Sequence, residues 1–257
     1  MHIVKIAEKE NGYFPVQKKM LIDDGISASA LATLEKKGVL SVERFQIDRI
    51  KLDQGNNLAF KKLTKAQLEA LKQLENEMLI HKVTLLHGVT GSGKTELYVQ
   101  LIQDQLDQGK QVLFLLPEIA LTTQLIQRLS AYFGEKIGVY HSKFNQNERV
   151  EIWNKVLQDD PHEFRIILGA RSSVFLPFQN LGLIIVDEEH ESSFKQYDPS
   201  PRYNGRDAAI VLGRMHEAKV LLGTATPSLE TYTNAKQGKY GLVSLKERYK
   251  GLSLIHI

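Results

Sequence analysis

From residue 63 onward, short apolar runs alternate with segments that have the spacing of amphipathic helices. The runs typical of buried strands occur at 83–87, 111–116, 136–140, 165–169, 182–187 and 219–223. In the helical segments the apolar residues are spaced so that they fall on one face of a helix. Leu97, Leu101 and Leu106 within 96–106 are an example. Because strands that alternate with helices form parallel sheets, the pattern predicts a doubly wound, mainly parallel α/β sheet.

The first sixty residues have a different pattern. Residues 27–37 (SASALATLEKK) predict a helix that begins at Ser27 and ends before Gly38, and residues 39–47 predict a strand. A helix, a glycine and a strand in this order resemble the end of a winged-helix module, whose helix can enter a DNA groove. A small helical adaptor without a nucleic-acid role is the alternative, and the pattern does not separate the two.

The polar stretch 53–57 (DQGNN) predicts a linker between the two regions. We therefore expect a small winged-helix-like, DNA-binding domain over residues 1–58 and an α/β domain over residues 59–249.

Between the first strand and the first helix of the α/β region, residues 88–95 read GVTGSGKT, a complete P-loop. Its glycines let the backbone turn and point N–H groups at phosphate oxygens, Lys94 supplies a positive charge, and Thr95 supplies a hydroxyl for Mg²⁺. The sequence thus predicts a RecA-like P-loop NTPase that binds ATP and Mg²⁺ through Gly88, Val89, Thr90, Gly91, Ser92, Gly93, Lys94 and Thr95.

A second motif, DEEH at 187–190, follows the apolar run LGLIIV. Ligands of parallel sheets bind at the carboxyl ends of strands, so these carboxylates are expected near the nucleotide. We expect Asp187 to hold Mg²⁺ and Glu188 to orient or deprotonate the attacking water, with Lys94 as the third catalytic residue. A solvated acidic loop is the alternative, and the P-loop on the same chain weighs against it.

Thr64 and Gln67 have the spacing of a capping box at the start of a helix. In many helicases a glutamine just before the P-loop strand instead binds the adenine edge. The sequence leaves both roles open for Gln67.

Composition narrows the possibilities further. The chain of 257 residues has a formal net charge of +3, which permits nucleic-acid binding without arguing for it, and no cysteine, which excludes disulfides and Cys-based zinc sites. The first residues lack the apolar core of a signal peptide, and no apolar run approaches membrane-spanning length. We expect a cytoplasmic protein without a membrane partner.

Four further segments resemble segments of one protein family. They are LPEIALTTQL (116–125), GARSSVFLPF (169–178), ESSFKQYDPSPRYNGRDAA (191–209) and GTATPS (223–228), and together with DEEH they resemble the primosomal protein N′ (PriA) family of superfamily 2 helicases. The resemblance covers residues 12–249. It implies an ATP-dependent 3′-to-5′ DNA helicase of replication restart, with single-stranded and forked DNA, primosome proteins and single-strand-binding proteins as partners.

The resemblance also implies roles for particular residues. Thr224 or Thr226 would hydrogen-bond to His190 and so couple the nucleotide state to DNA. The loop after DEEH would stack and hold single-stranded DNA, although a loop anchored in the core by Phe194 and Tyr203 is the alternative. The loop residues concerned are Phe194, Lys195, Tyr197, Arg202 and Tyr203. Phosphate contacts are expected from Arg171, Ser172 and Ser173, and from Thr122, Thr123, His141 and Ser142.

The sequence also departs from the family. The family's N-terminal DNA-end-binding domain, second motor lobe, Cys-rich zinc module and C-terminal domain have no counterpart here, and residues 250–257 do not continue the family pattern. Because the second lobe supplies an arginine finger, we expect Mg-ATP binding with poor hydrolysis and no unwinding. The alternatives are a nucleotide- and DNA-binding module without turnover, or another superfamily 2 translocase of restriction or repair.

Overall fold

The computed structural model describes residues 2–8, 12–17, 21–22, 26–37, 39–44, 60–117, 120, 123–140 and 146–248. The chain divides into two compact units, Met1–Lys51 and Leu52–Ile257. The expected linker at 53–57 and the tail at 250–257 lie outside the described residues. So do Thr122, His141 and Ser142, and for Thr123 the backbone alone is described.

The first unit contains a three-stranded antiparallel sheet and, among its described residues, a helix of nine residues. The strand order is β2-β1-β3, with β1 at His2–Glu8, β2 at Gly12–Gln17 and β3 at Leu40–Arg44. Helix α2 (Ala28–Lys36) begins where Ser27 Oγ accepts a hydrogen bond from the Ala30 N–H at 3.2 Å. The expected helix and strand are therefore confirmed, the β1–β2 hairpin was not predicted, and the winged-helix assignment stays a prediction.

The second unit contains a parallel sheet of seven strands in the order β10-β4-β9-β8-β5-β7-β6. This confirms the predicted doubly wound α/β fold, with β10 as an edge strand that the pattern did not reveal. The strands are β4 (Val83–Gly88), β5 (Gln111–Leu115), β6 (Ile137–Tyr140), β7 (Ile166–Gly169), β8 (Leu181–Asp187), β9 (Lys219–Thr224) and β10 (Gly241–Leu245).

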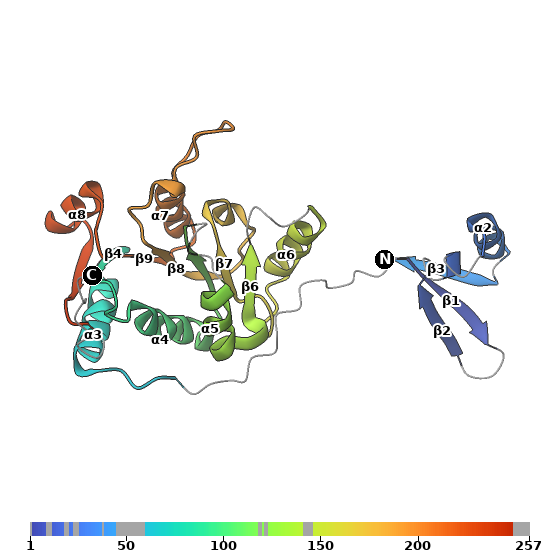
Figure 1. Cartoon of the computed structure of the whole chain (residues 1–257), viewed down its shortest axis with the longest axis horizontal. Helices are drawn as coiled ribbons and strands as arrows, with labels where there is room; N and C mark the ends of the chain where they lie inside the picture. The colour runs from blue at the N-terminus through green and yellow to red at the C-terminus, as the bar shows by residue number, and fades with distance from the viewer. Residues whose placement is uncertain are drawn as a thin grey trace, which may run out of the picture. The chain divides into compact units, whose positions relative to one another are not determined.

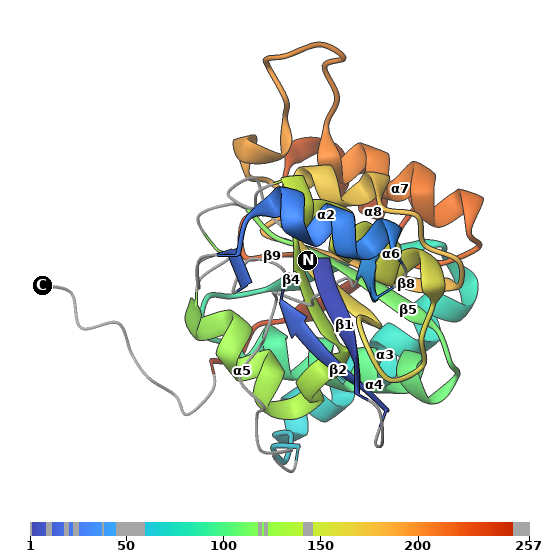
Figure 2. The same ribbon diagram turned by 90° about the vertical axis from the view of Figure 1, so that its right-hand side faces the viewer.

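Helices cover both faces of this sheet. In Figure 1, α3, α4 and α5 lie on one side and α6, α7 and α8 on the other, and Figure 2 shows the same division. Across the described residues, no helix combines the length and the apolar character needed to cross a membrane. The helices are α3 (Lys65–Ile80), α4 (Lys94–Asp107), α5 (Thr123–Phe133), α6 (Gln146–Gln158), α7 (Gly205–Met215) and α8 (Leu229–Lys236).

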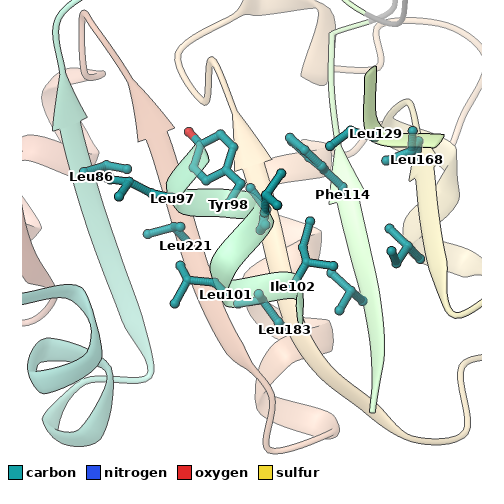
Figure 3. Close-up of a cluster of buried hydrophobic side chains, with 14 of the residues drawn as sticks. Leu86, Leu97, Tyr98, Leu101, Ile102, Phe114, Leu129, Leu168, Leu183 and Leu221 are labelled. Atoms are coloured by element: carbon teal, nitrogen blue, oxygen red, sulfur yellow. The ribbon is translucent and has the colours of Figure 1, made fainter. Parts of the chain in front are cut away.

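The main core lies between the sheet and the face formed by α3, α4 and α5. Helix α4 has Leu97, Tyr98 and Ile102 wholly buried, and Figure 3 shows them beside Phe114 of β5 and Leu221 of β9. Buried strands of a parallel sheet are apolar on both faces, which is why their sequences are continuous apolar runs. The helix that follows the P-loop is thereby fixed to the centre of the sheet.

The strand order brings three motifs together. Strand β9 lies between β4 and β8, with His87 beside Thr224 and Asp187 beside Gly223. The P-loop follows β4, DEEH ends β8, and GTATPS begins at the end of β9. All three therefore emerge at the carboxyl edge of the sheet, where parallel sheets bind ligands.

Candidate functional site

The P-loop adopts a conformation that its glycines make possible. Gly91 and Gly93 have φ values of 77° and 82°, in the left-handed region, and Gly93 is the N-cap of α4. A side chain at Gly88 would approach Lys94 Cγ to 2.9 Å. The lysine side chain thus folds back over the loop, and its Nζ donates a hydrogen bond to the Gly88 carbonyl at 3.0 Å.

A pocket of about 590 Å³ opens at this loop. Ser92 Oγ is buried there without a hydrogen-bond partner among the described residues. A helix N-terminus, a lysine and an unpartnered hydroxyl fit the phosphates of a nucleotide. The lining residues are Lys61, Val89, Thr90, Gly91, Ser92, Gly93, Lys94, Thr95, Glu96, Arg128, Asp187 and Glu188.

Asp187 lies in the pocket wall together with Thr95. Tyr98 donates a hydrogen bond from its hydroxyl to Asp187 Oδ1 at 2.8 Å. Burial raises the pKa of Asp187 to about 6, and the hydrogen bond from Tyr98 opposes that rise. The described residues contain no cluster of three His, Cys, Asp or Glu side chains able to hold a metal. A hydroxyl and one carboxylate beside a phosphate pocket nevertheless fit Mg²⁺, which keeps several waters and shares its coordination with phosphates.

Glu188 has a strained backbone, with φ of 49° although it is not a glycine. Its Oε1 lies 3.9 Å from Lys94 Nζ, and its Oε2 accepts a hydrogen bond from Thr224 Oγ1 at 3.5 Å. The strained turn directs this carboxylate to the same pocket as Lys94 and Asp187. The structure therefore brings the three expected catalytic residues together, and their roles stay predictions.

His190 contacts both threonines named from the sequence. Its Nδ1 lies 2.8 Å from Thr224 Oγ1, and its Nε2 lies 3.2 Å from Thr226 Oγ1. Thr224 is wholly buried, whereas Thr226 is exposed. The contacts between DEEH and GTATPS exist as expected, and their role in coupling stays a prediction.

Glu189 was not singled out from the sequence, yet its carboxylate is the most heavily bonded of the four DEEH side chains. It accepts hydrogen bonds from the Ser228 N–H at 2.7 Å, from Thr231 Oγ1 at 2.9 Å and from Arg206 Nη1 at 3.0 Å. Burial lowers the pKa of Arg206, but hydrogen bonds to Asp207 and Glu189 outweigh this effect and hold the pKa above its usual value. The network joins DEEH to GTATPS and to the start of α7, and an isolated DEEH motif gives no signal of it.

Gln67 forms the capping box that its spacing predicts. Its Oε1 accepts from the Thr64 N–H at 3.0 Å, and its Nε2 donates to the Ser92 carbonyl of the P-loop at 3.0 Å. The side chain is 2% exposed. The capping role is confirmed, and an adenine-binding role, which would require these hydrogen bonds to be replaced, stays a prediction.

Two aromatic residues of the loop after DEEH pack against other parts of the protein, and one of them is buried. Phe194 is 1% exposed, so it anchors the loop in the core and offers no face to a base, which corrects the expectation that it stacks on DNA. Tyr203 packs edge-on against Phe175, with ring centroids 5.0 Å apart. For Phe194 the structure supports the alternative of a loop anchored in the core. Tyr203 is partly exposed and packs on Phe175, which is itself 57% exposed, so the DNA contact of Tyr203 stays a prediction.

The tip of the loop, residues 197–202, is exposed. The loop projects beyond α7 in Figures 1 and 2, and Lys195, Tyr197 and Arg202 are exposed on it. Lys195 Nζ lies 5.1 Å from the centre of the Tyr197 ring. Gln196 closes the loop through hydrogen bonds to the carbonyls of Pro199 and Pro201, at 2.8 and 3.1 Å. These exposed side chains remain candidates for DNA contact.

The three residues after β7 that were expected to contact phosphates differ in exposure and hydrogen bonding. Arg171 Nη1 donates to the carbonyls of Ser193 and Lys195, at 3.2 and 3.1 Å, so this guanidinium supports the loop. Ser172 is partly exposed, whereas Ser173 is wholly buried and its hydroxyl lies 3.5 Å from the Tyr140 carbonyl. Burial makes Ser173 a structural residue and corrects its expected phosphate contact; those of Arg171 and Ser172 stay predictions.

Comparison with known proteins agrees with this geometry. Residues 64–235 match the family model described as DEAD/DEAH box helicase. The chain is 42% identical over 250 residues to the replication restart protein PriA of Bacillus subtilis (strain 168), covering 95% of this chain and 30% of that protein. It is 46% identical over 202 residues to the PriA of Rickettsia conorii (strain ATCC VR-613 / Malish 7), covering 79% of this chain and 30% of that protein.

A solved structure has the same fold. RecG bound to a three-way DNA junction superposes with a TM-score of 0.54 and 24% identity, covering 75% of this chain and 25% of RecG. The chain spans about 30% of the length of the PriA proteins described above. The sequence resemblance to PriA is confirmed, and the chain belongs to the DEAD/DEAH box helicase family.

Proposed function

We propose that this chain provides the ATP-binding lobe of a DNA helicase that acts in replication restart. Such a helicase would use Mg-ATP hydrolysis to move 3′ to 5′ along single-stranded DNA at forks, together with primosome and single-strand-binding proteins. The similarity to the replication restart proteins PriA supports the process. We infer the DNA substrate and a cytoplasmic location from that process. The direction of movement and the partners come from that resemblance.

One observation carries the proposal. The P-loop lysine, the first two acidic residues of DEEH and the threonines of GTATPS meet at one edge of the sheet. Lys94 Nζ lies 3.9 Å from Glu188, and Glu188 lies 3.5 Å from Thr224. Because His190 contacts the same Thr224, a change at the phosphates has a short route to GTATPS.

Each residue has a role that its position permits. Lys94 would exchange its hydrogen bond to Gly88 for the β- and γ-phosphates, and the P-loop N–H groups would hold the remaining oxygens. Thr95 and Asp187 would hold Mg²⁺, which when bound neutralises charge on the phosphates. Glu188 would orient the attacking water.

DNA contact would fall on the exposed part of the loop between β8 and α7. Tyr197 is 61% exposed and offers a ring for stacking, and Lys195 and Arg202 offer charge for phosphates. The loop leads directly into Arg206, whose guanidinium contacts Glu189 of DEEH. This gives DNA at the loop a physical connection to the nucleotide pocket.

On these 257 residues alone, we expect nucleotide and DNA binding with slow turnover and no unwinding. Among the described residues, one sheet is the parallel, seven-stranded sheet of a motor lobe, whereas superfamily 2 motors place ATP between two lobes and take an arginine finger from the second. Such a finger contributes about 10³–10⁵ in rate. The cysteine-rich zinc module of the family would also have to come from elsewhere, because this chain has no cysteine.

The test is Mg-ATP binding by isothermal titration, with Lys94→Ala as the variant. Loss of the lysine charge should abolish measurable binding while leaving the circular dichroism spectrum unchanged. Lys72→Ala, at an exposed position of α3 away from the pocket, is the matched control and should bind like the parent. Equal affinity in Lys94→Ala and the parent chain would refute the proposed pocket.

Turnover with and without single-stranded DNA completes the test. Binding with little hydrolysis in both conditions would agree with a lone ATP-binding lobe. Hydrolysis strongly stimulated by DNA would show instead that this chain, or an oligomer of it, supplies the missing cationic group.

A further inference from the structure

Tyr98 lies where the three motifs meet but belongs to none of them. It is on α4, one turn after Thr95, and its side chain is wholly buried. Its hydroxyl donates a hydrogen bond to Asp187 Oδ1 at 2.8 Å. The P-loop helix and the first acidic residue of DEEH are therefore joined by one side chain.

The first residue of GTATPS lies next to the same hydroxyl. A side chain at Gly223, the first residue of GTATPS, would lie 1.8 Å from the Tyr98 hydroxyl oxygen and 3.2 Å from Asp187 Oδ1. The Gly223 carbonyl accepts a hydrogen bond from the Glu189 N–H at 3.2 Å. Glycine at 223 thus provides the space in which the tyrosine and aspartate meet.

The tyrosine ring cannot easily reorient. It packs edge-on against Phe114, with centroids 5.4 Å apart and an interplanar angle of 82°. Figure 3 shows the ring among Leu97, Ile102 and Phe114, with its oxygen directed away from these apolar side chains. A hydroxyl held this firmly fixes the carboxylate that it contacts.

We propose that Tyr98 is a positioning residue that sets Asp187 relative to Thr95, so that both are placed for one Mg²⁺ ion. The inference rests on the proposed function of the pocket. Thr95 and Tyr98 move together because they lie on one helix turn, and the hydrogen bond makes Asp187 follow them. Groups that orient metal ligands in this way typically affect metal affinity about 10–100-fold.

The competing explanation is that the hydroxyl merely satisfies a buried aspartate. The two explanations predict different ratios of ATP affinity with Mg²⁺ to ATP affinity without it. A positioning residue changes how much Mg²⁺ strengthens nucleotide binding, whereas a merely structural one changes the free energy of unfolding and leaves that ratio alone.

The experiment measures ATP affinity of the whole chain in Mg²⁺ and in EDTA, for the parent chain and for Tyr98→Phe. The variant keeps the ring and its contact with Phe114 and removes the hydroxyl alone. We expect the ratio of the two affinities to fall about tenfold, with the affinity in EDTA unchanged. The Mg²⁺ concentration for half-maximal binding should rise by a similar factor.

Tyr240→Phe is the matched control, because its side chain lies outside the pocket and interacts with Asn234. It should leave the ratio unchanged. A second arm compares the double variant Tyr98→Phe/Asp187→Asn with Asp187→Asn alone. If Tyr98 acts through Asp187, the two variants should show the same remaining Mg²⁺ dependence of ATP affinity.

The outcomes separate the two proposals. A parent chain with a clear Mg²⁺ effect and a Tyr98→Phe variant with the same ratio would overturn the positioning role and leave the nucleotide pocket standing. A parent chain that binds no ATP in either condition would overturn the proposed pocket, and the inference with it.

Discussion

The nucleotide pocket and the loop between β8 and α7 both start at the carboxyl edge of the sheet, but they are held in different ways. The pocket is formed by backbone turns at Gly91 and Gly93 and by a helix whose inner side is buried in the core. The loop is held by hydrogen bonds from side chains: Arg171 reaches it from the segment after β7, and Gln196 closes it from within. The pocket is thus defined largely by backbone turns of one continuous stretch of chain, and the loop by side-chain hydrogen bonds to its carbonyls.

Two adjacent glutamates show the same contrast at smaller scale. Glu188 lines the pocket and is partly exposed, whereas the side chain of Glu189 is wholly buried in a network with Arg206, Ser228 and Thr231. A one-residue step in sequence therefore separates a residue suited to chemistry from one suited to holding three segments together. The predictions below test this division, beginning with the largest expected effect.

Phe194→Ala and Tyr197→Ala should separate the anchor of the loop from its exposed surface. Phe194 is buried, so its truncation should lower the free energy of unfolding by about 3–5 kcal/mol. Tyr197 is 61% exposed, so its truncation should change stability by less than about 0.5 kcal/mol and weaken single-stranded DNA binding by about 1–3 kcal/mol. Urea unfolding and fluorescence anisotropy measure the two effects. If Phe194→Ala weakened DNA binding without loss of stability, the inward assignment would be wrong.

Glu189→Ala should destabilise the protein by about 3 kcal/mol, because Arg206 and the Ser228 N–H would lose their shared acceptor. Glu230→Ala is the matched control: this glutamate lies exposed in the first turn of α8 and its loss should cost at most about 1 kcal/mol. Thermal unfolding measures both. Similar melting temperatures for the two variants would show that the network does not hold the three segments together.

Gly223→Ala should cost about 1–3 kcal/mol, since the added methyl group would collide with the Tyr98 hydroxyl at 1.8 Å. Adding Tyr98→Phe should recover part of the loss, because the nearest remaining tyrosine atom lies at 3.0 Å. A double-mutant cycle in urea measures this coupling. Strict additivity of the two changes would argue that the collision is relieved by backbone movement.

Lys195→Ala should have the smallest effect of the four changes, and the effect should fall on the salt dependence of DNA binding. Removal of one phosphate-contacting charge should reduce the slope of log affinity against log salt by about 0.7 for single-stranded DNA. Lys236→Ala is the control, because that lysine also lies over a tyrosine, Tyr232, at 5.4 Å, but on α8. Equal slopes for both variants would place the DNA contact outside the loop.

Much of the fold follows from local sequence. Six strands of the parallel sheet could be predicted because strands buried on both faces are continuous apolar runs. Strand β10 could not, because its burial alternates along Gly241–Leu245 as expected for an edge strand, and five residues give little pattern. The β1–β2 hairpin of the first unit was not predicted because polar residues interrupt the apolar pattern of β1 and Pro15 lies within β2.

The candidate site divides in the same way. The P-loop and DEEH are recognisable because each is one turn attached to one strand, so residue spacing alone determines the geometry of phosphate and acidic groups. Tyr98 and Glu189 were missed because their partners lie 89 and 39 residues away, in segments whose proximity depends on strand order.

By itself, then, the sequence determined the parallel α/β architecture, the phosphate-binding loop and the acidic motif, since these depend on periodicity and on backbone turns within a few residues. The tertiary structure alone decided that Phe194 is buried while Tyr197 is exposed. It also decided that Asp187 accepts a hydrogen bond from Tyr98 in the space next to Gly223. Burial and hydrogen-bond partners depend on which strands become neighbours, and the order β4-β9-β8 is a property of the whole sheet.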